Sequence, residues 1–304
     1  MSLKKKTILI FLIIFGFLNL TFFVFSKTIL KPGFLKIESV DAEKNIERVT
    51  ETLNMQIENL ALKFFDWSNW DDCYNYVANG NEEFIKSNLI DPVILDMDVN
   101  LFFLKNIDGT FRLAKVIDHE KQTVIDMSEN LKQYFTNNEH YFNFKYDEYQ
   151  KNGLILLPEI GPVFFTSQAV LTSEKKGPSM GQLFAAKKVD TILIEKIKKV
   201  THLELELKLA EEAANDNWYK NIVTELEEPK KFKMVPIDTK TIASIIPFDD
   251  IFGIRIFYLK MTMDRSILAQ GTKTINIFLL ATLLSSVLTG IIYVFILYRR
   301  VFIK

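Results

Sequence analysis

Two long apolar runs lie near opposite ends of the chain, and a region of mixed polarity lies between them. Thr7 to Ser26 and Thr274 to Tyr298 contain no charged residue. At about 1.5 Å per helical residue, each run is long enough to cross a hydrocarbon core of about 30 Å. The pattern therefore predicts transmembrane helices over residues 7–26 and 274–298.

Basic residues flank both runs, with Lys4, Lys5 and Lys6 before the first and Arg299, Arg300 and Lys304 after the second. Short basic flanks stay in the cytoplasm, so residues 1–6 and 299–304 are expected to be cytoplasmic tails. Residues 27–273 then form one extracytoplasmic domain, and the protein is expected to pass twice through the plasma (inner) membrane. Two alternatives remain open, a cleaved signal peptide for the first run and a buried helix for the second.

A helical period follows the first run. Pro32-Gly33 is expected to break the helix, and apolar residues then recur at spacings of three and four, at Ile46, Val49, Leu53, Ile57, Leu60, Phe64 and Trp67. This stripe predicts a long helix directly after the membrane. It can pack on its own domain, or part of it can pair with a second copy of the protein.

The period changes to that of strands from Val99. Residues 99–105 and 110–117 flank Asp108-Gly109, which predicts a β-hairpin because Asp-Gly supplies the positive φ of a tight turn. Further strands are expected at 154–157, 161–171 and 181–187, with a turn at 173–178 and a helix at 190–200 that Asp190 caps.

A second group of extended segments follows, at 203–209, 231–237, 240–247 and 253–261. These strands can complete the first sheet or build a membrane-proximal sub-domain, and both arrangements remain open. From Thr262 the chain is expected to be helical into the second span. The predicted fold class is α+β, in which two transmembrane helices bracket a long N-terminal helix and an antiparallel sheet lobe.

Composition excludes some classes of function. The formal net charge is −1, which provides no electrostatic attraction for nucleic acid. Cys73 is the only cysteine, so an intrachain disulfide is excluded and packing has to hold the core.

The densest cluster of chemically capable residues is the nine-residue segment Asp66 to Tyr74. Its aromatic residues would continue the apolar stripe if the helix ran on, which is a core role. Two tryptophans, a tyrosine and three aspartates also suit a small-molecule pocket, where aromatic walls hold the ligand and a few polar groups orient it. The candidate ligand-binding residues are Asp66, Trp67, Trp70, Asp71, Asp72, Tyr74 and Arg265. Arg265 can instead pair with a carboxylate or act as an interfacial anchor.

The same segment resembles the CHASE4 domain, an extracytoplasmic sensory module of bacterial and archaeal signalling proteins. The resemblance runs in order over roughly residues 45 to 272. It is carried by Trp67, Trp70, Asp71, Asp72, Tyr74, Asn88-Leu89, Asp108-Gly109, Gly181-Gln182-Leu183 to Asp190, and Asp264-Arg265-Ser266-Ile267 to Gly271.

What this resemblance implies is a PAS-like or Cache-like sensor for an unknown small molecule, acting as a homodimer in the membrane. Relatives carry diguanylate cyclase, phosphodiesterase or histidine kinase modules, whose motifs this sequence lacks, so no enzyme activity is expected. A separate cytoplasmic output protein is then an expected partner. Tyr298 to Lys304 resembles the start of a HAMP-type linker, which keeps a truncated receptor open as an alternative. A non-signalling surface or partner-binding protein is another.

Motifs for catalysis and for metal binding are missing from the sequence. His119, His140 and His202 are far apart and have no metal-ligand spacing. The sequence contains no Gly-x-Ser-x-Gly, no Walker loop, no Cys-x-x-Cys and no EF-hand. We therefore expect no catalytic residue, no metal and no cofactor.

Overall fold

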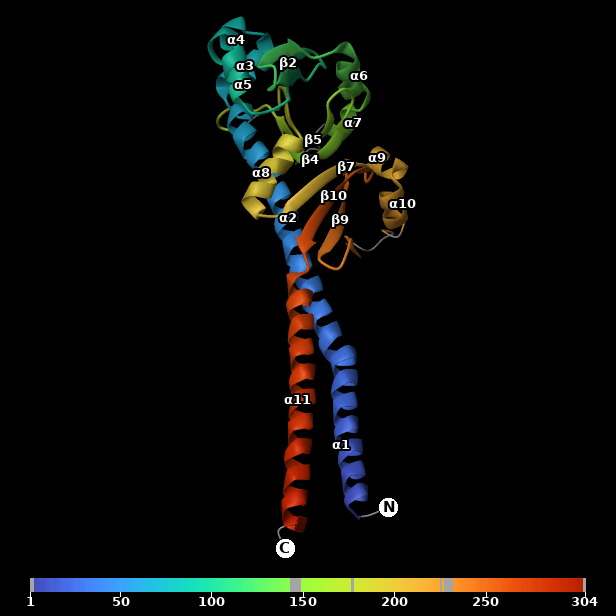
Figure 1. The fold of residues 1–304 in the computed structure, drawn as a ribbon. Coiled ribbons are helices and arrows are strands. Elements are labelled where there is room, and N and C mark those ends of the chain that lie inside the picture. Colours follow the sequence, from blue (N-terminus) through green and yellow to red (C-terminus); the bar gives the residue numbers. More distant parts are fainter. Residues whose placement is uncertain (1–2, 143–148, 176–177, 225, 227–231, 303–304) are drawn as a thin grey trace. The chain divides into compact units, whose positions relative to one another are not determined.

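The computed structural model describes residues 3–142, 149–175, 178–224, 226 and 232–302 (Figure 1). The chain divides into two compact units. Unit 1 comprises Met1–Asn45, Met234–Ala243 and Thr262–Lys304, and unit 2 comprises Ile46–Lys233 and Ser244–Met261. The second half of the predicted turn at 173–178 (residues 176 and 177), the predicted strand residue Lys231 and the last two residues of the tail lie outside the described residues.

The first helical segment is continuous, and the predicted break at Pro32-Gly33 is wrong. Helix α1 (Leu3–Phe25) passes into a five-residue π-helical turn, η1 (Ser26–Leu30), and then into α2 (Lys31–Ser68). Pro32 lies in the first turn of α2, directly after the wide π turn. A proline has no N–H to donate, and a π turn next to it accommodates the missing bond and the ring.

Helix α11 (Ser266–Phe302) contacts α1 within unit 1. Asn19 Nδ2 donates to Ser286 Oγ over 2.9 Å, and the Phe11 and Tyr293 rings stack with centroids 5.2 Å apart. The segments Lys6–Ser68 and Ser266–Ile296 are long and apolar enough to contain a membrane span. Both predicted spans therefore fall on helices, and a polar contact joins those helices.

Unit 2 contains a six-stranded antiparallel sheet in the order β3-β2-β1-β6-β5-β4. The strands are β1 (Leu101–Asn106), β2 (Phe111–Asp118), β3 (Thr123–Asp126), β4 (Gln150–Leu157), β5 (Gly161–Ala169) and β6 (Gly181–Lys188). The predicted hairpin is confirmed, and Gly109 adopts the positive φ of 90° that its turn requires. Strand β3 was not predicted.

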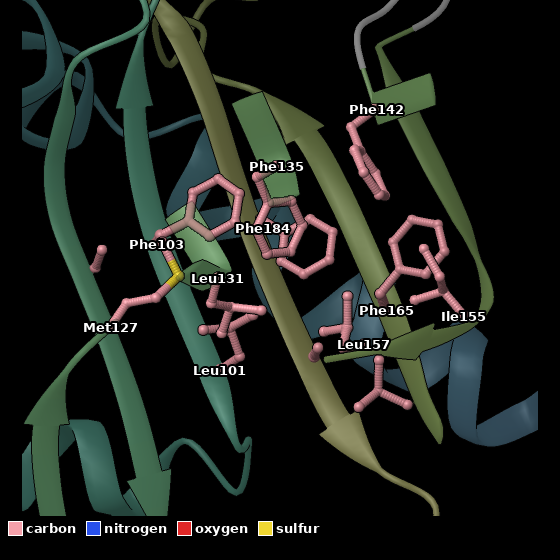
Figure 2. Packing of buried hydrophobic residues seen from close by; sticks show 13 residues of the cluster. Leu101, Phe103, Met127, Leu131, Phe135, Phe142, Ile155, Leu157, Phe165 and Phe184 are labelled. Atoms are coloured by element: carbon pink, nitrogen blue, oxygen red, sulfur yellow. The ribbon is translucent and has the colours of Figure 1, made fainter. Parts of the chain in front are cut away.

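One face of this sheet carries the aromatic core under α6 (Glu129–Asn137) and α7 (Glu139–Phe142). Figure 2 shows Phe103, Phe165 and Phe184 on neighbouring strands, with Phe135 and Phe142 packed against them. The Phe103 and Phe184 rings stack at 4.9 Å.

Successive strand residues point to opposite faces of the sheet, and the face opposite the aromatic core packs against α2. The Phe64 and Phe102 rings lie 5.7 Å apart, and Leu53 and Val49 are buried. Of the predicted stripe only Ile57 and Trp67 are half-buried rather than buried. The interpretation that the stripe packs within its own chain is therefore confirmed. Helices α3 (Asp71–Asn79), α4 (Glu82–Asn88) and α5 (Asp91–Asp96) follow α2.

A second, four-stranded sheet has the order β7-β10-β9-β8. Its strands are β7 (Glu204–Leu209), β8 (Lys233–Pro236), β9 (Thr241–Asp249) and β10 (Arg255–Asp264), so this group does not complete the first sheet. Helix α8 (Thr191–Thr201) precedes it, and Asp190 caps α8 at Leu193 N as predicted. Helices α9 (Ala210–Asn215) and α10 (Asn217–Val223) lie between β7 and β8 in the chain.

The predicted start of the last helix at Thr262 is wrong, because strand β10 continues to Asp264. Arg265 N donates to Lys240 O over 2.7 Å, and this backbone bond holds the strand end beside its neighbour. Helix α11 therefore begins only at Ser266.

The turn between β9 and β10 contacts the edge strand of the six-stranded sheet, within unit 2. Ile251 N donates to Leu154 O over 3.1 Å. A Cβ added to Gly153 would lie 2.6 Å from Ile251 Cγ2, so this position admits only glycine without a shift. Phe252 packs against the aromatic core. The two sheets are thus joined by a tight contact between β4 and this turn.

Candidate functional site

The tryptophan–aspartate segment lies where α2 ends, and the continuous helix that its spacing allowed is not formed. Helix α2 ends at Ser68, Trp70 is extended (φ −108°, ψ 128°), and α3 begins at Asp71. Ser68 O accepts from Leu171 N (2.9 Å), and Asn69 Nδ2 donates to Phe65 O (2.7 Å). These bonds give the last carbonyls of α2 partners outside the helix, as a helix end requires.

A groove of about 510 Å³ opens at this helix end. The Trp67 and Trp70 rings meet edge to face with centroids 5.9 Å apart, and Trp70 also contacts Phe84 at 5.5 Å. Both tryptophans are half-buried, so each has a packed side and an exposed side. The groove is lined by Phe65, Asp66, Trp67, Asn69, Trp70, Ser173 and Lys175.

The other wall of the groove comes from the turn after β5, about one hundred residues further along the chain. Asp71 Oδ1 accepts from Ser173 N over 2.8 Å, which ties this turn to the start of α3. Lys175 Nζ lies 4.4 Å from the centroid of the Phe65 ring, a cation–π distance. Ser173 and Lys175 are site residues that the sequence did not indicate, because no local pattern relates them to the tryptophans.

A buried polar network leads from the groove into the sheet. Asn69 Nδ2 donates to Ser68 Oγ (3.1 Å), which lies 3.2 Å from Gln168 Oε1. Gln168 Nε2 donates to Thr166 Oγ1 (3.0 Å), and Thr166 Oγ1 donates to Asn152 Oδ1 (2.7 Å). The network thus runs from the end of α2 through β5 to β4.

One acceptor in this network has no donor. Asn69 Oδ1 is buried and has no hydrogen-bond partner among the described residues. An unpaired buried acceptor costs about 1–3 kcal/mol of stability.

The predicted site residues do not all lie together. Asp66, Trp67 and Trp70 line the groove, and Asp71 orders its wall through Ser173. Asp72 is exposed and Tyr74 half-buried, and neither lines the groove. Between them Cys73 is fully buried, and burial raises the pKa of its thiol to about 12.

Arg265 belongs to unit 1 and does not line the groove. Arg265 Nη2 donates to Glu38 Oε2 over 2.9 Å, and the two side chains are only 11% and 4% exposed. The carboxylate partner expected as one alternative is therefore a residue of the chain itself. This ion pair joins α2 to the start of α11.

No group of three His, Cys, Asp or Glu side chains that could hold a metal ion occurs among the described residues. The aspartates of the segment are spread over a helix end, a loop and a helix start, which is not a ligand cage.

A model of the family described as "CHASE4 domain" matches residues 52–208, which are 157 of the 304 residues and so slightly more than half of the chain. The chain belongs to the CHASE4 family. The match contains the tryptophan–aspartate segment and all seven residues that line the groove. It ends before residue 272, so Arg265 lies outside the part of the chain that the CHASE4 model matches.

The chain is similar to the methanogenesis regulatory histidine kinase FilI of Methanothrix harundinacea, with 22% identity over 254 residues. This alignment covers 84% of the chain but only 28% of the length of that kinase.

Two solved structures have a similar fold. One is the extracellular domain of a histidine kinase named vpHK1S-Z8, with a TM-score of 0.53, 10% identity and coverage of 79% of this chain and 95% of that one. The other is a domain of a sensory box/GGDEF family protein from Vibrio parahaemolyticus, with a TM-score of 0.52, 11% identity and coverage of 78% and 99%. The chain therefore carries a CHASE4 sensor domain of α+β fold, flanked by two helices apolar enough to cross a membrane.

Proposed function

We propose that this protein is a membrane-anchored extracytoplasmic sensor that binds a small molecule in the groove at the end of α2. The observation that carries the proposal is the groove itself. The tryptophan–aspartate segment supplies aromatic walls and a carboxylate in one place, and Asn69 of the same lining carries a buried acceptor that has no donor among the described residues. Aromatic walls with a few polar groups are the usual lining of a small-molecule site.

The contacts of unit 2 supply a route from this groove toward α11. The polar network connects Asn69 to Asn152 on β4, and Gly153 and Leu154 on the same strand hold Ile251. From there the chain continues through β10 into α11. Ligand contact with Asn69 would bias this network between two hydrogen-bonded arrangements, and α11 would carry the change through the membrane. The output would then be a module of the kind that histidine kinases carry.

The proposal places residues 1–6 and 299–304 in the cytoplasm and the sensor domain outside, as the basic flanks indicate. A Cys73→Ser background allows a direct test with single cysteines introduced at Lys4 or at Lys121. In intact cells an impermeant maleimide should label the cysteine at position 121 and not the one at position 4. Labelling of both positions, or of position 4 alone, would contradict this topology.

A blocking variant tests the groove. Ser173 is exposed in the groove wall, so Ser173→Trp should fill the groove without disturbing the core. A metabolite panel is screened by thermal shift on the full chain in nanodiscs. A compound that stabilises the wild type should lose its effect on Ser173→Trp. Ser87→Trp, at an exposed position of α4, is the matched control and should respond as the wild type does. Equal stabilisation of all three proteins would place the ligand elsewhere.

A homodimer is part of the same proposal, because the CHASE4 domain that the chain carries is of a kind that often dimerises. Analytical ultracentrifugation of the full chain in detergent should give a mass of two chains. A single-chain mass at micromolar concentration would contradict the dimer.

A further inference from the structure

We infer that the groove selects a protonated organic amine with an apolar or aromatic body. This inference rests on the proposed function, since it names the ligand class of the same groove. Three observations on the described residues support it: the carboxylate in the groove, the aromatic walls and the charge of the tryptophan–aspartate segment.

The tryptophan–aspartate segment supplies the groove with the Asp66 carboxylate and with no cation. Asp66 adds an exposed carboxylate, whereas Asn69 Oδ1 is buried and has no donor among the described residues, so a ligand reaches it only if neighbouring side chains shift. Asn69 already uses its Nδ2 to donate to Phe65 O and Ser68 Oγ, so the side chain cannot flip without losing those bonds. An ammonium group has N–H donors to offer to such oxygens and has no acceptor of its own.

The aromatic walls suit a cation as well as an apolar body. Trp67 and Trp70 are half-buried, and tryptophan is the strongest aromatic partner for an ammonium. At the rim of the groove Lys175 Nζ already lies over the Phe65 ring at 4.4 Å. The chain's own ammonium therefore shows that this wall accepts a positive charge.

The charge of the tryptophan–aspartate segment adds to this preference. The segment Asp66 to Tyr74 contains three aspartates and neither lysine nor arginine. Lys175 is the one cation among the described residues that line the groove, so an amine and Lys175 repel each other while Asp66 attracts the amine.

These charges predict which head group should bind best and in which direction each variant should change the affinity. The full chain in nanodiscs carries Trp218→Phe, which leaves Trp67 and Trp70 as the only tryptophans, so fluorescence reports on the groove. The probes share one aromatic body and differ in the head group: 2-phenylethylamine, 3-phenylpropionate, phenylalanine and 2-phenylethanol. We expect 2-phenylethylamine to bind with the highest affinity, at a Kd of about 1 mM or below.

Variants then assign the head group. Asp66→Asn should weaken 2-phenylethylamine about two- to fivefold, and Lys175→Met should strengthen it about twofold, as exposed charge interactions allow. Matched controls are Glu58→Gln on α2 and Lys199→Met on α8, both at exposed positions outside the groove, and neither should change the Kd.

The possible results separate the two proposals. Tighter binding of 3-phenylpropionate, with weakening by Lys175→Met, overturns the amine and keeps the groove as a ligand site. Tighter binding of phenylalanine, weakened by both variants, assigns a zwitterion and also overturns it. A preference for 2-phenylethanol has the same meaning. If none of the four probes changes the fluorescence, the amine inference fails, and the Ser173→Trp screen decides separately whether the groove binds anything.

Discussion

Gln168 holds α2 on the six-stranded sheet, and replacing it with leucine should loosen that contact by a calculable amount. Its side chain is 1% exposed. Its Nε2 donates to Ala61 O (2.7 Å) and to Thr166 Oγ1 (3.0 Å), and its Oε1 lies 3.2 Å from Ser68 Oγ. Leucine has a similar volume and removes all three contacts.

The size of the loss follows from what the partners keep. Ser68 Oγ retains Phe65 O at 2.9 Å, and Thr166 Oγ1 retains Asn152 Oδ1 at 2.7 Å, so neither hydroxyl is left unpaired. Each net hydrogen bond contributes about 1 kcal/mol. Burying leucine avoids the desolvation cost of burying an amide, which offsets part of the lost hydrogen-bond energy. Gln168→Leu should therefore lower the free energy of unfolding by about 1–3 kcal/mol.

The assay is a urea titration of the full chain in detergent, followed by circular dichroism. Gln182→Leu is the matched control, because Gln182 is also buried but bonds on the opposite face, to Phe142 O and Ser167 Oγ. Both variants should lose similar stability, and only Gln168→Leu should change the affinity of a groove ligand. A change in unfolding free energy below about 0.5 kcal/mol would refute the stabilising role. Equal ligand affinity in both variants would refute the route through the network.

Three further predictions concern other contacts. Gly271→Ala places a Cβ 2.4 Å from the Phe34 ring and should lower the free energy of unfolding by about 1–3 kcal/mol, measured by thermal unfolding. Gly33→Ala, whose Cβ would have nothing within 4 Å, should not lower it. If Gly33→Ala lost as much stability as Gly271→Ala, steric contact would not be the cause. Arg265→Met leaves the buried Glu38 carboxylate without its partner and should lower the free energy of unfolding by about 3–5 kcal/mol, measured by thermal unfolding. The double variant with Glu38→Leu should recover part of this stability. If the double variant recovered none, loss of the ion pair would not be the cause. Burial raises the pKa of the Cys73 thiol to about 12, so about one molecule in ten thousand is a thiolate at pH 8. A thiol reagent should therefore modify Cys73 only after urea unfolds α3. Rapid labelling of the native chain would contradict the burial of this side chain.

Local chemistry was enough to predict the hairpin and the capped helix, because Asp108-Gly109 and Asp190 act on their immediate neighbours. The end of α2 could not be predicted in this way. The spacing of Trp67 and Trp70 is the same in a continuous helix, and the bond that stops the helix comes from Leu171. Tertiary contacts of this kind override local propensity.

The candidate site shows the same division. Its tryptophans and Asp66 were recognisable as a cluster of suitable residue types, and they line the groove. Ser173 and Lys175 come from a turn whose approach to α2 depends on the register of β5, which no short motif encodes. The pairing of Arg265 with Glu38 could not be predicted either, because the two residues are 227 positions apart in the sequence.

The π turn at Ser26–Leu30 also sets the helical phase of everything after it. A π turn holds one residue more than an α-helical turn, and one residue corresponds to about 100° of rotation around a helix. The helical periodicity of α2 is therefore shifted by one residue relative to that of α1. A single helical wheel drawn through both would assign the wrong face to one of them. For the same reason, a one-residue deletion within this turn, made together with Pro32→Ala, is the length change in the first 68 residues that both helices should tolerate best.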